Sequence, residues 1–534
     1  MPTLSRREFN KALAGTLLSG TALSSGLVSR ESTTPQPGGT KRPNIVFVCT
    51  DQHSAQYAGF ARHPLVRTPH LDRIAAGGTV FTSAYCGSPL CVPGRSSMMT
   101  GMYPSDVNSF CNSTVYDGSH PTWGKRLRES GYHCWAVGKQ DLNPAVDLGF
   151  VEVAVDHGHA KGPDITSLFR RPVGYRIGER EGIDGSTSEK SEGDSRGGRR
   201  ASVAGRDLHD TQTAVQFIRK EAAALGKPWV AFVGLRQPHP PWIGRKEYFD
   251  YYLPLVQPPQ VPLEELEQLP LPYQVMRHFK RIATPIPEAR IRRAIAAYFS
   301  MITEVDSCVG EIYRALEETG QAGNTFFIYT SDHGESLGEH GLWLKNNLYE
   351  GAVRIPLVIS GPQVPQGKKV AAPVSHVDLV ATMLEWATVS KPGDLRGTSL
   401  SPLLAGGSEE GARFVYAESH SEGNPTGSCL IRKGEWKLIH FSYYEDYLFN
   451  LKDDPKETRN RATDPSAQEV MKDLQATLHR LVDPEEVTER AFAAQAKILQ
   501  GFADRMNEEE LFALFKSRLG DGQARVMARA LKHA

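Results

Sequence analysis

The residues best suited to chemistry in this chain begin with a cysteine that is followed closely by a proline and an arginine. Residues 87–95 read G-S-P-L-C-V-P-G-R, so Cys91, Pro93 and Arg95 form a C-x-P-x-R motif. Pro93 has a fixed φ and no N–H to donate, which favours the first turn of a helix. The motif therefore predicts that Cys91 lies at a helix N-terminus, where peptide dipoles favour an anionic substrate and Arg95 adds a permanent positive charge.

Two acidic residues follow apolar runs that read as buried strands. Asp51 comes directly after residues 43–50, and Asp332 follows residues 325–330. Apolar runs of this kind indicate strands that are covered on both faces, as in a parallel sheet. Because ligands of open α/β sheets bind at the carboxyl ends of such strands, these carboxylates are candidate site residues.

A lysine and a histidine also stand where apolar runs end. Lys139 follows residues 132–137, and it is either a solvated turn residue or a cation placed at the end of a core strand. His239 follows residues 229–235 among prolines, and it is either a capped turn histidine or a group that protonates a departing alkoxide. An imidazole titrates near neutrality, which suits the second role.

These motifs, and the longer run S-P-L-C-V-P-G-R-S-S-M-M-T-G, resemble the type I, formylglycine-dependent sulfatases of the alkaline phosphatase superfamily. The matches follow one another in order over residues 44–461. The resemblance implies that Cys91 is oxidised to formylglycine, whose aldehyde hydrates to a geminal diol. One hydroxyl would attack sulfur and the other would later expel sulfate, a route that a plain serine or cysteine lacks.

The resemblance also implies the catalytic roles. Arg95 would hold the diol, and Lys139 would bridge the diol and a sulfate oxygen. Lys345 would bind another sulfate oxygen, where charge develops during transfer, and His239 would protonate the leaving group. The catalytic set that follows is Cys91, Arg95, Lys139, His239 and Lys345.

One divalent cation is a further implication of the resemblance. Its ligands would be Asp51, Gln52, Cys91, Asp332 and His333. Because most of these ligands are oxygens, Ca²⁺ is favoured and Mg²⁺ is an alternative, while the imidazole nitrogen leaves Mn²⁺ open. The cation would act as a Lewis acid and help to ionise the attacking hydroxyl.

The sequence departs from the family pattern at two positions. Gln52 replaces a second aspartate, which resembles the choline sulfatase and phosphonate monoester hydrolase branch. Asp141 stands where sulfatases usually have a histidine, and a carboxylate facing an anionic substrate is unfavourable unless a cation pairs with it. The role of that histidine is therefore open. His157 and His159 lie in a polar segment and are predicted to be solvated.

Composition limits the possible functions. The 534 residues are 40% hydrophobic and 23% charged, which is typical of a globular protein. The formal net charge is zero, so nothing favours nucleic acid or an anionic membrane as a partner. Seven cysteines in so long a chain do not form a disulfide framework.

The N-terminus resembles an export signal. Residues 5–11 read S-R-R-E-F-N-K and precede a mildly apolar stretch at residues 12–28, as in a bacterial twin-arginine (Tat) signal. The alternatives are a disordered basic N-terminus or an uncleaved anchor, but the stretch is too polar and short for a convincing span. We therefore expect Tat export and a periplasmic or secreted location.

The expected fold is α/β, with a large, mostly parallel mixed sheet between helices, as in alkaline phosphatase, and a smaller C-terminal antiparallel sheet. The expected parts are a signal peptide at 1–30, a linker at 31–42, a catalytic domain at 43–404, the small sheet at 405–464 and a helical tail at 465–534. Long loops at 158–207 and 248–272 would decide the substrate.

The expected function is hydrolysis of a sulfate monoester to an alcohol and inorganic sulfate. The alternatives are a phosphonate or phosphate ester hydrolase on the same scaffold and an inactive anion-binding homologue, which the missing histidine at position 141 suggests. The expected partners are a sulfated small molecule or carbohydrate, a formylglycine-generating enzyme and the Tat machinery. Whether His340 and Glu350 line the site or only support the scaffold is open, as is the oligomeric state.

Overall fold

The computed structural model describes residues 42–161, 164–168, 186–188, 203–280, 282–407, 413–519 and 521–533. The predicted signal peptide, and the linker except for residue 42, lie outside these residues. Within the described parts, no helix combines the length and the apolar composition that crossing a membrane requires. All seven cysteines are buried free thiols.

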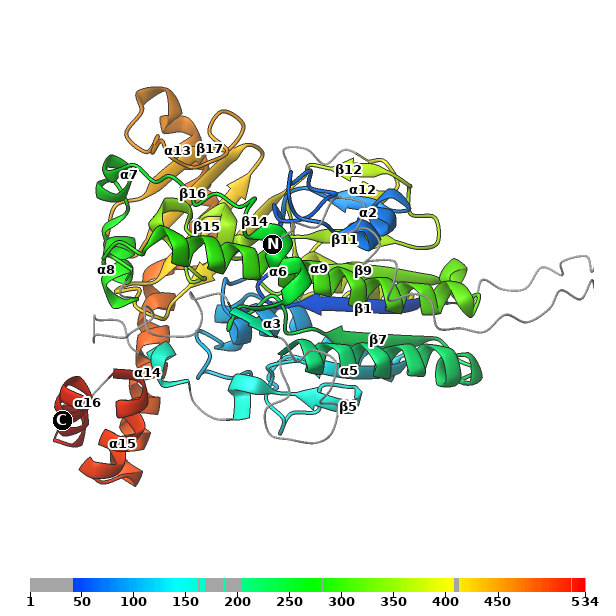
Figure 1. Ribbon diagram of the computed structural model, residues 1–534, viewed down its shortest axis with the longest axis horizontal. Helices are drawn as coiled ribbons and strands as arrows, with labels where there is room; N and C mark the ends of the chain where they lie inside the picture. Colours follow the sequence, from blue (N-terminus) through cyan, green and yellow to red (C-terminus); the bar gives the residue numbers. More distant parts are fainter. Residues whose placement is uncertain are drawn as a thin grey trace, which may run out of the picture.

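A mixed eight-stranded sheet forms the centre of the molecule (Figure 1). Five neighbouring strands run parallel to one another in the order β9-β1-β7-β4-β5. Beyond β9, β11 is antiparallel to its neighbours and the sheet ends at β2 and β12. The strands are β1 (Asn44–Thr50), β2 (Thr79–Phe81), β4 (His133–Lys139), β5 (Val151–Asp156), β7 (Trp229–Gly234), β9 (Thr325–Ser331), β11 (Leu357–Ser360) and β12 (Lys368–Val370).

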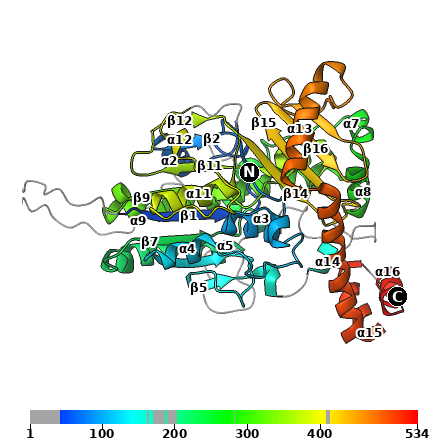
Figure 2. The ribbon, with the colours of Figure 1, turned by 180° about the vertical axis from the view of Figure 1, so that it is seen from behind.

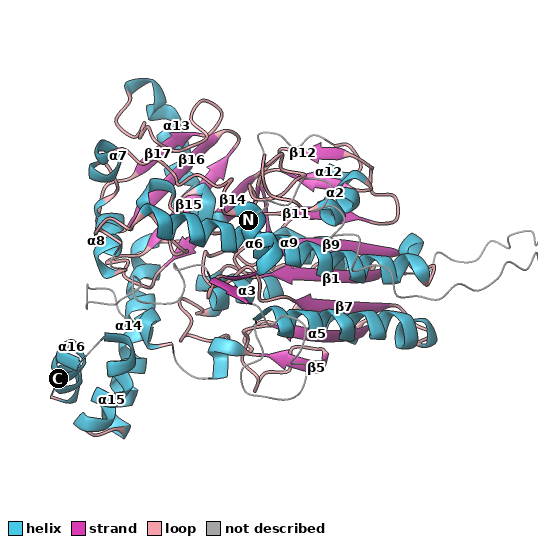
Figure 3. Cartoon of the chain, in the orientation of Figure 1, coloured by secondary structure: helices cyan, strands magenta, loops and turns pink. Residues whose placement is uncertain are grey.

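Helices cover both faces of this sheet (Figure 3). The alternating side chains of β1 show why, because Ile45, Phe47 and Cys49 enter one apolar cluster while Val46 and Val48 enter another. The first cluster includes side chains of α3 (Cys91–Thr100), α4 (Trp123–Glu129) and α11 (His376–Trp386). The second includes side chains of α2 (Pro69–Ala76), α5 (Val203–Gln216) and α9 (Glu288–Glu318).

A four-stranded antiparallel sheet follows as a separate layer. It has the order β14-β15-β16-β17 and one face covered by α13, whose Leu474 and Leu478 are buried against it. The elements are β14 (Phe414–Ser419), β15 (Ser428–Lys433), β16 (Trp436–Phe441), β17 (Tyr447–Asn450) and α13 (Gln468–Leu481). The predicted fold class, including this second sheet, is confirmed.

Three helices complete the described chain: α14 (Pro484–Arg505), α15 (Glu508–Leu519) and α16 (Asp521–Lys532). Figure 2 shows α14 leading away from the small sheet, with α15 and α16 at its far end. The remaining short elements are β3 (Ala84–Tyr85), β6 (Ser186–Ser188), β8 (Ile243–Arg245), β10 (Arg354–Ile355), β13 (Val374–Ser375), α6 (Lys246–Tyr252), α7 (Leu263–Glu267), α8 (Leu271–Phe279), α10 (Glu350–Val353) and α12 (Ser401–Leu404).

Two largely apolar runs are each divided between two sheets in the structure. Residues 80–85 contribute to β2 in the large sheet and to β3 in a separate three-stranded sheet. Residues 354–359 contribute to β10 and β11 in the same way, and the break falls at Pro356, which has no N–H for the ladder. Together these breaks turn the chain from the large sheet to the small three-stranded one, next to α3.

Candidate active site

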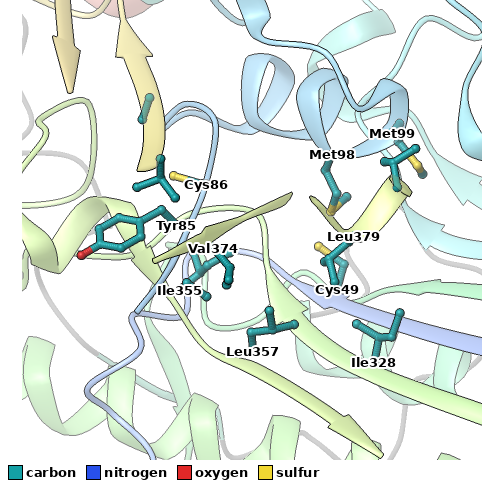
Figure 4. Close-up of a cluster of buried hydrophobic side chains, with 14 of the residues drawn as sticks. Cys49, Tyr85, Cys86, Met98, Met99, Ile328, Ile355, Leu357, Val374 and Leu379 are labelled. Carbon is teal, nitrogen blue, oxygen red and sulfur yellow. The ribbon is translucent and has the colours of Figure 1, made fainter. Parts of the chain in front are cut away.

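Cys91 is the first residue of α3, as the motif predicted, and it is fully buried. The N–H of Val92 is bound by the side chain of Asn112, whose Oδ1 accepts it at 3.1 Å. Further along the helix, Met98 and Met99 anchor α3 in the core, and Figure 4 shows Met98 directed toward Cys49 and Leu379. The helix therefore presents residue 91 from a fixed position.

Gly94 allows α3 to approach the end of β9. A Cβ at this position would lie 2.8 Å from the carbonyl oxygen of Ser88 and 3.1 Å from that of Asp332. Both neighbouring atoms belong to the backbone and cannot rotate away. The glycine inside the C-x-P-x-R motif thus sets the distance between Cys91 and the carboxylates of the sheet.

The five parallel strands all place polar residues around Cys91, because their carboxyl ends meet at one edge of the sheet. β1 is followed by Asp51 and Gln52, and β9 by Asp332 and His333. The remaining strands contribute Lys139 and Asp141 (β4), His239 (β7) and His159 (β5). Lys345 comes from the loop after β9.

Two buried carboxylates face Cys91. Its Sγ lies 3.8 Å from each carboxylate oxygen of Asp51 and 3.5 Å from Nε2 of His333. Arg95, also fully buried, donates from Nε to Asp332 at 2.8 Å and from Nη1 to the carbonyl oxygen of Lys139 at 2.7 Å. Burial and the nearby Asp51 carboxylate raise the pKa of Asp332. Arg95 is therefore held by the scaffold while it partly neutralises Asp332.

Two lysines contact the same thiol. Nζ of Lys345 lies 2.9 Å from Sγ of Cys91, and Nζ of Lys139 lies 3.8 Å from it. Lys139 also forms ion pairs with Asp51 and, at 3.0 Å, with Asp141. Burial alone would raise the pKa of the Cys91 thiol, but the two lysines hold it well below its usual value. The position favours an anion.

The donor set fits a divalent cation. The ligand atoms of Asp51, Cys91, Asp332 and His333 lie within 4.8 Å of one another, and all four residues are buried. The side-chain N–H of Gln52 donates to Glu335. The Oε1 of Gln52 is buried and has no hydrogen-bond partner among the described residues. A cation held by these five residues would balance the two carboxylates and satisfy this oxygen.

His239 reaches the site from the loop after β7. It is close enough to Cys91 for a hydrogen bond between the side chains. One ring nitrogen, Nδ1, lies 2.5 Å from the carbonyl oxygen of Pro240, which fixes it as the donor of that bond. Burial and the charge of Lys345 lower the pKa of His239.

The prediction that His159 is solvated holds only in part, since 32% of its side chain is exposed while its ring lies beside Cys91. Ligand atoms of Cys91, Asp141 and His159 lie within 4.8 Å of one another. Burial opposes protonation of His159, but the nearby Cys91 side chain and the charge of Asp141 raise its pKa to about 9. The signal that could have revealed it is the H-x-H pair directly after the alternating run V-E-V-A-V-D, which forms β5.

Three other candidate residues lie outside this cluster. The prediction that His157 is solvated was wrong: it is buried, and its ring contacts the carbonyl oxygen of Leu142 and the carboxylate of Glu152. His340 pairs with Glu265 at 2.8 Å and stacks on Tyr349. Glu350 pairs with Lys437 and Arg354. These side chains therefore support the scaffold.

Comparison with known proteins supports the same interpretation. Residues 43–389 match the family model described as Sulfatase, and residues 338–484 match the one described as N-sulphoglucosamine sulphohydrolase, C-terminal. Arylsulfatase K of Danio rerio is 30% identical over 92% of this chain and 91% of its own length. Choline-sulfatase of Rhizobium meliloti (strain 1021) is 30% identical over 80% of this chain and 83% of its own.

Solved structures share the fold. The phosphonate monoester hydrolase of Agrobacterium radiobacter has a TM-score of 0.67 at 24% identity, covering 82% of this chain and 95% of its own. A structure in complex with its substrate, D-glucosamine-2-N,6-O-disulfate, also has a TM-score of 0.67, at 22% identity, covering 84% and 100%. At these identities the likeness concerns the fold alone.

Proposed function

The chain belongs to the sulfatase family, as a type I sulfatase of the alkaline phosphatase superfamily and a sulfuric ester hydrolase, and we propose that it acts through a formylglycine made from Cys91 beside one bound divalent cation. The observation that carries this proposal is the convergence on Cys91. The thiol lies at the N-terminus of α3, within reach of two carboxylates, two lysines and three histidines.

The modified residue would supply a pair of hydroxyls on one carbon, one to attack sulfur and one to allow later release of sulfate. Asp51, Gln52, Asp332 and His333, with residue 91, would hold the cation. When bound there, the cation supplies Lewis acidity at the sulfuryl group and helps a hydroxyl to ionise. The oxygen-rich donor set favours Ca²⁺, with Mg²⁺ and Mn²⁺ as alternatives.

The chain's own cations bind and orient the sulfuryl group. Lys345 and Lys139, which contact Sγ of Cys91, are placed to bind sulfuryl oxygens as negative charge develops on them. Arg95 keeps a fixed orientation, because its guanidinium donates to Asp332 and to the carbonyl oxygen of Lys139. These groups are preorganised by burial, which strengthens each electrostatic contact.

His239 is the proposed proton donor to the leaving alkoxide. Its Nδ1 is committed to the carbonyl oxygen of Pro240, so Nε2 is the nitrogen that handles the proton. The lowered pKa of His239 makes its cation a stronger acid, although it also reduces the protonated fraction at neutral pH.

The substrate is proposed to be a sulfate monoester of a carbohydrate or of a small alcohol. Support for the first comes from the fold neighbour solved with a sulfated glucosamine, and support for the second from the similarity to choline-sulfatase. Sulfate release from a panel of sulfated sugars and small esters, with Cys91→Ala as the blank, tests the proposal. Release from none of them by enzyme that carries formylglycine would contradict it.

A second candidate function, hydrolysis of phosphonate or phosphate esters, is favoured by Gln52, which the resemblance associates with the phosphonate monoester hydrolase branch. Turnover of an aryl sulfate, an aryl phosphonate monoester and a phosphate diester by the same preparation separates the two. The proposed sulfatase has its highest kcat/KM on the sulfate ester. An inactive homologue would bind inorganic sulfate and turn over none of the three.

We also propose that the protein is exported by the Tat route to the periplasm or beyond, on the basis of the residues 5–28 alone. Export after folding would allow modification of Cys91 and metal loading in the cytoplasm. Fractionation of a producing cell, with Arg6→Lys/Arg7→Lys as the variant, tests this. Unchanged export of the double variant would contradict it.

A further inference from the structure

The loop after β5 brings a histidine to the nucleophile that the family resemblance does not account for. β5 is the outermost of the five parallel strands, and His159 follows its last residue, Asp156, by three positions. A ring nitrogen of His159, a carboxylate oxygen of Asp141 and Sγ of Cys91 all lie within 4.8 Å of one another. Each of the five parallel strands thus provides a polar side chain at residue 91.

Asp141 stabilises the loop that carries His159. Its Oδ1 accepts the backbone N–H of His159 at 3.0 Å, and its Oδ2 pairs with Lys139 at 3.0 Å. Gly158 makes this contact possible, because a Cβ there would lie 1.9 Å from Oδ1 of Asp141. With no exposed surface and both oxygens engaged, Asp141 is bound to the protein and is not directed at an anionic substrate.

A second contact holds the imidazole itself. Nδ1 of His159 lies 3.7 Å from Oδ2 of Asp164, and the same oxygen accepts from Nδ2 of Asn112 at 3.4 Å. Asn112 in turn binds the N–H of Val92 in the first turn of α3. The ring is therefore oriented by a chain of contacts that ends one residue from Cys91.

We propose that His159 is a catalytic residue of this enzyme, which hydrogen-bonds to residue 91 and to the sulfuryl group held there, and that Asp141 is its positioning residue. The proposal rests on the proposed function. A carboxylate at position 141 accepts hydrogen bonds only, whereas an imidazole can donate one to a sulfuryl or hydroxyl oxygen. His159, from the loop after β5, would thus take the place of the histidine that sulfatases usually have at position 141.

The test compares His159→Ala with wild type in the full-length enzyme. We expect kcat/KM on an aryl sulfate to fall by about 100- to 1000-fold, as for loss of one preorganised donor. The dissociation constant of inorganic sulfate, measured by calorimetry, should rise about tenfold. Because 32% of the His159 side chain is exposed, the space left by the missing ring would be open to solvent, and added imidazole should restore activity by about tenfold or more.

His157→Ala is the matched control, since it removes a buried imidazole from the same loop whose ring contacts Leu142 and Glu152. We expect a lower melting temperature, a kcat/KM within about threefold of wild type and no response to imidazole. An equal loss of kcat/KM in both variants would overturn the proposal, because the loop and not the imidazole would then matter.

Asp141 is tested by a double-mutant cycle. Asp141→Ala should lower kcat/KM by about 10- to 100-fold in wild type and by several-fold less in the His159→Ala background, where only its ion pair with Lys139 remains to be lost. Independent, multiplicative losses would overturn its positioning role.

Two further results would overturn the catalytic role of His159. One is a kcat/KM and a sulfate affinity both within threefold of wild type in His159→Ala. The other is a folded, fully modified His159→Ala enzyme whose lost activity imidazole does not restore. If wild type releases sulfate from no ester, the proposed function fails instead, and the sulfate affinities of the two proteins still decide on His159.

Discussion

Around Cys91, individual buried charges balance one another closely. Three permanent cations, Arg95, Lys139 and Lys345, face the three carboxylates Asp51, Asp141 and Asp332, and all six residues are buried. Such a set leaves no surplus positive charge for an anionic ester. A divalent cation among the carboxylates would provide that surplus, which is why metal and substrate binding are expected to depend on each other.

Gln52 is predicted to be a ligand of the divalent cation. Its Oε1 is buried and without a partner among the described residues, so Gln52→Ala should remove one cation ligand. We expect the concentration of Ca²⁺ that half-restores sulfate release to metal-stripped enzyme to rise about 10- to 100-fold. Gln56→Ala, which loses only a contact with Glu339, is the control. Equal metal affinity in both variants would contradict the assignment.

Glu304 gives a prediction on pH. It accepts from the N–H of Arg245 and from the side chain of Gln237, two residues before His239, and burial raises its pKa from 4.5 to about 7. The folded state therefore binds this proton more tightly than the unfolded state does. Its contribution to stability is complete below pH 4.5 and is lost as pH rises toward 7.

Glu304→Gln should remove this dependence, because its oxygen can still accept the N–H of Arg245 while its NH2 group, which does not titrate, faces the side-chain amide of Gln237. Between pH 5 and pH 8, wild type should lose up to about 3 kcal/mol of unfolding free energy relative to the variant. Urea denaturation at several pH values measures the difference. Parallel curves for the two proteins would show that Glu304 does not titrate in this range.

Sequence reasoning at the residue scale worked where chemistry follows a motif and failed where it depends on a turn. Cys91 and Asp332 stand at the ends of regular elements, so their meeting could be expected. His159 depends on Gly158 and Asp141 packing together, a tertiary contact with no local pattern. Asn112 likewise binds the first turn of α3 through a tertiary contact that no local pattern indicates.

At the scale of elements, the closeness of α3 to β9 determines the geometry of the site. Gly94→Ala should force the helix away from Asp332, since the new Cβ would meet two backbone oxygens at 2.8 and 3.1 Å. We expect a loss of about 1–3 kcal/mol in stability and a drop of at least tenfold in kcat.

Gly77→Ala at the end of α2 is the control, because its Cβ would have only ordinary contacts at 3.6 Å. We expect the Gly77→Ala enzyme to have the same kcat as wild type. Full kcat in the Gly94→Ala enzyme would mean that the site does not depend on this approach.

The central strands could be predicted because each is a continuous apolar run with a polar residue at its end. β5 lacks this continuous apolar run: its alternating pattern indicates a strand, but Val151 and Val153 are exposed on this edge strand, so the pattern does not place it beside the central strands. The divided strands at residues 80–85 and 354–359 depend on pairing with a second sheet, which apolar content alone does not indicate.

At the scale of the whole molecule, the C-terminal helices reach back to the catalytic loop. α14 and α15 contact the short helix Ile165–Leu168, which follows His159 by six residues. Ile165, Leu168 and Phe515 belong to one buried apolar cluster. The sequence predicted helices here but gave no role for them, because their partner lies more than 300 residues away.

Phe515→Ala should therefore affect both stability and turnover. We expect the cavity left by the phenyl ring to lower the free energy of unfolding by about 3 kcal/mol. We also expect kcat/KM to fall several-fold as the loop that carries His159 loses its packing. Val526→Ala, at a side chain that is 68% exposed on α16, should change neither. A Phe515→Ala enzyme that is less stable but equally active would limit the tail to a structural role.

The most direct test of the central claim joins the mass of the peptide that contains residue 91 to the release of sulfate. Enzyme should be made with and without a formylglycine-generating enzyme in the host. We expect the peptide mass to change from thiol to aldehyde and sulfate release to rise in proportion to the modified fraction, with none from Cys91→Ala. Sulfate release by protein whose residue 91 is entirely unmodified cysteine would contradict the claim.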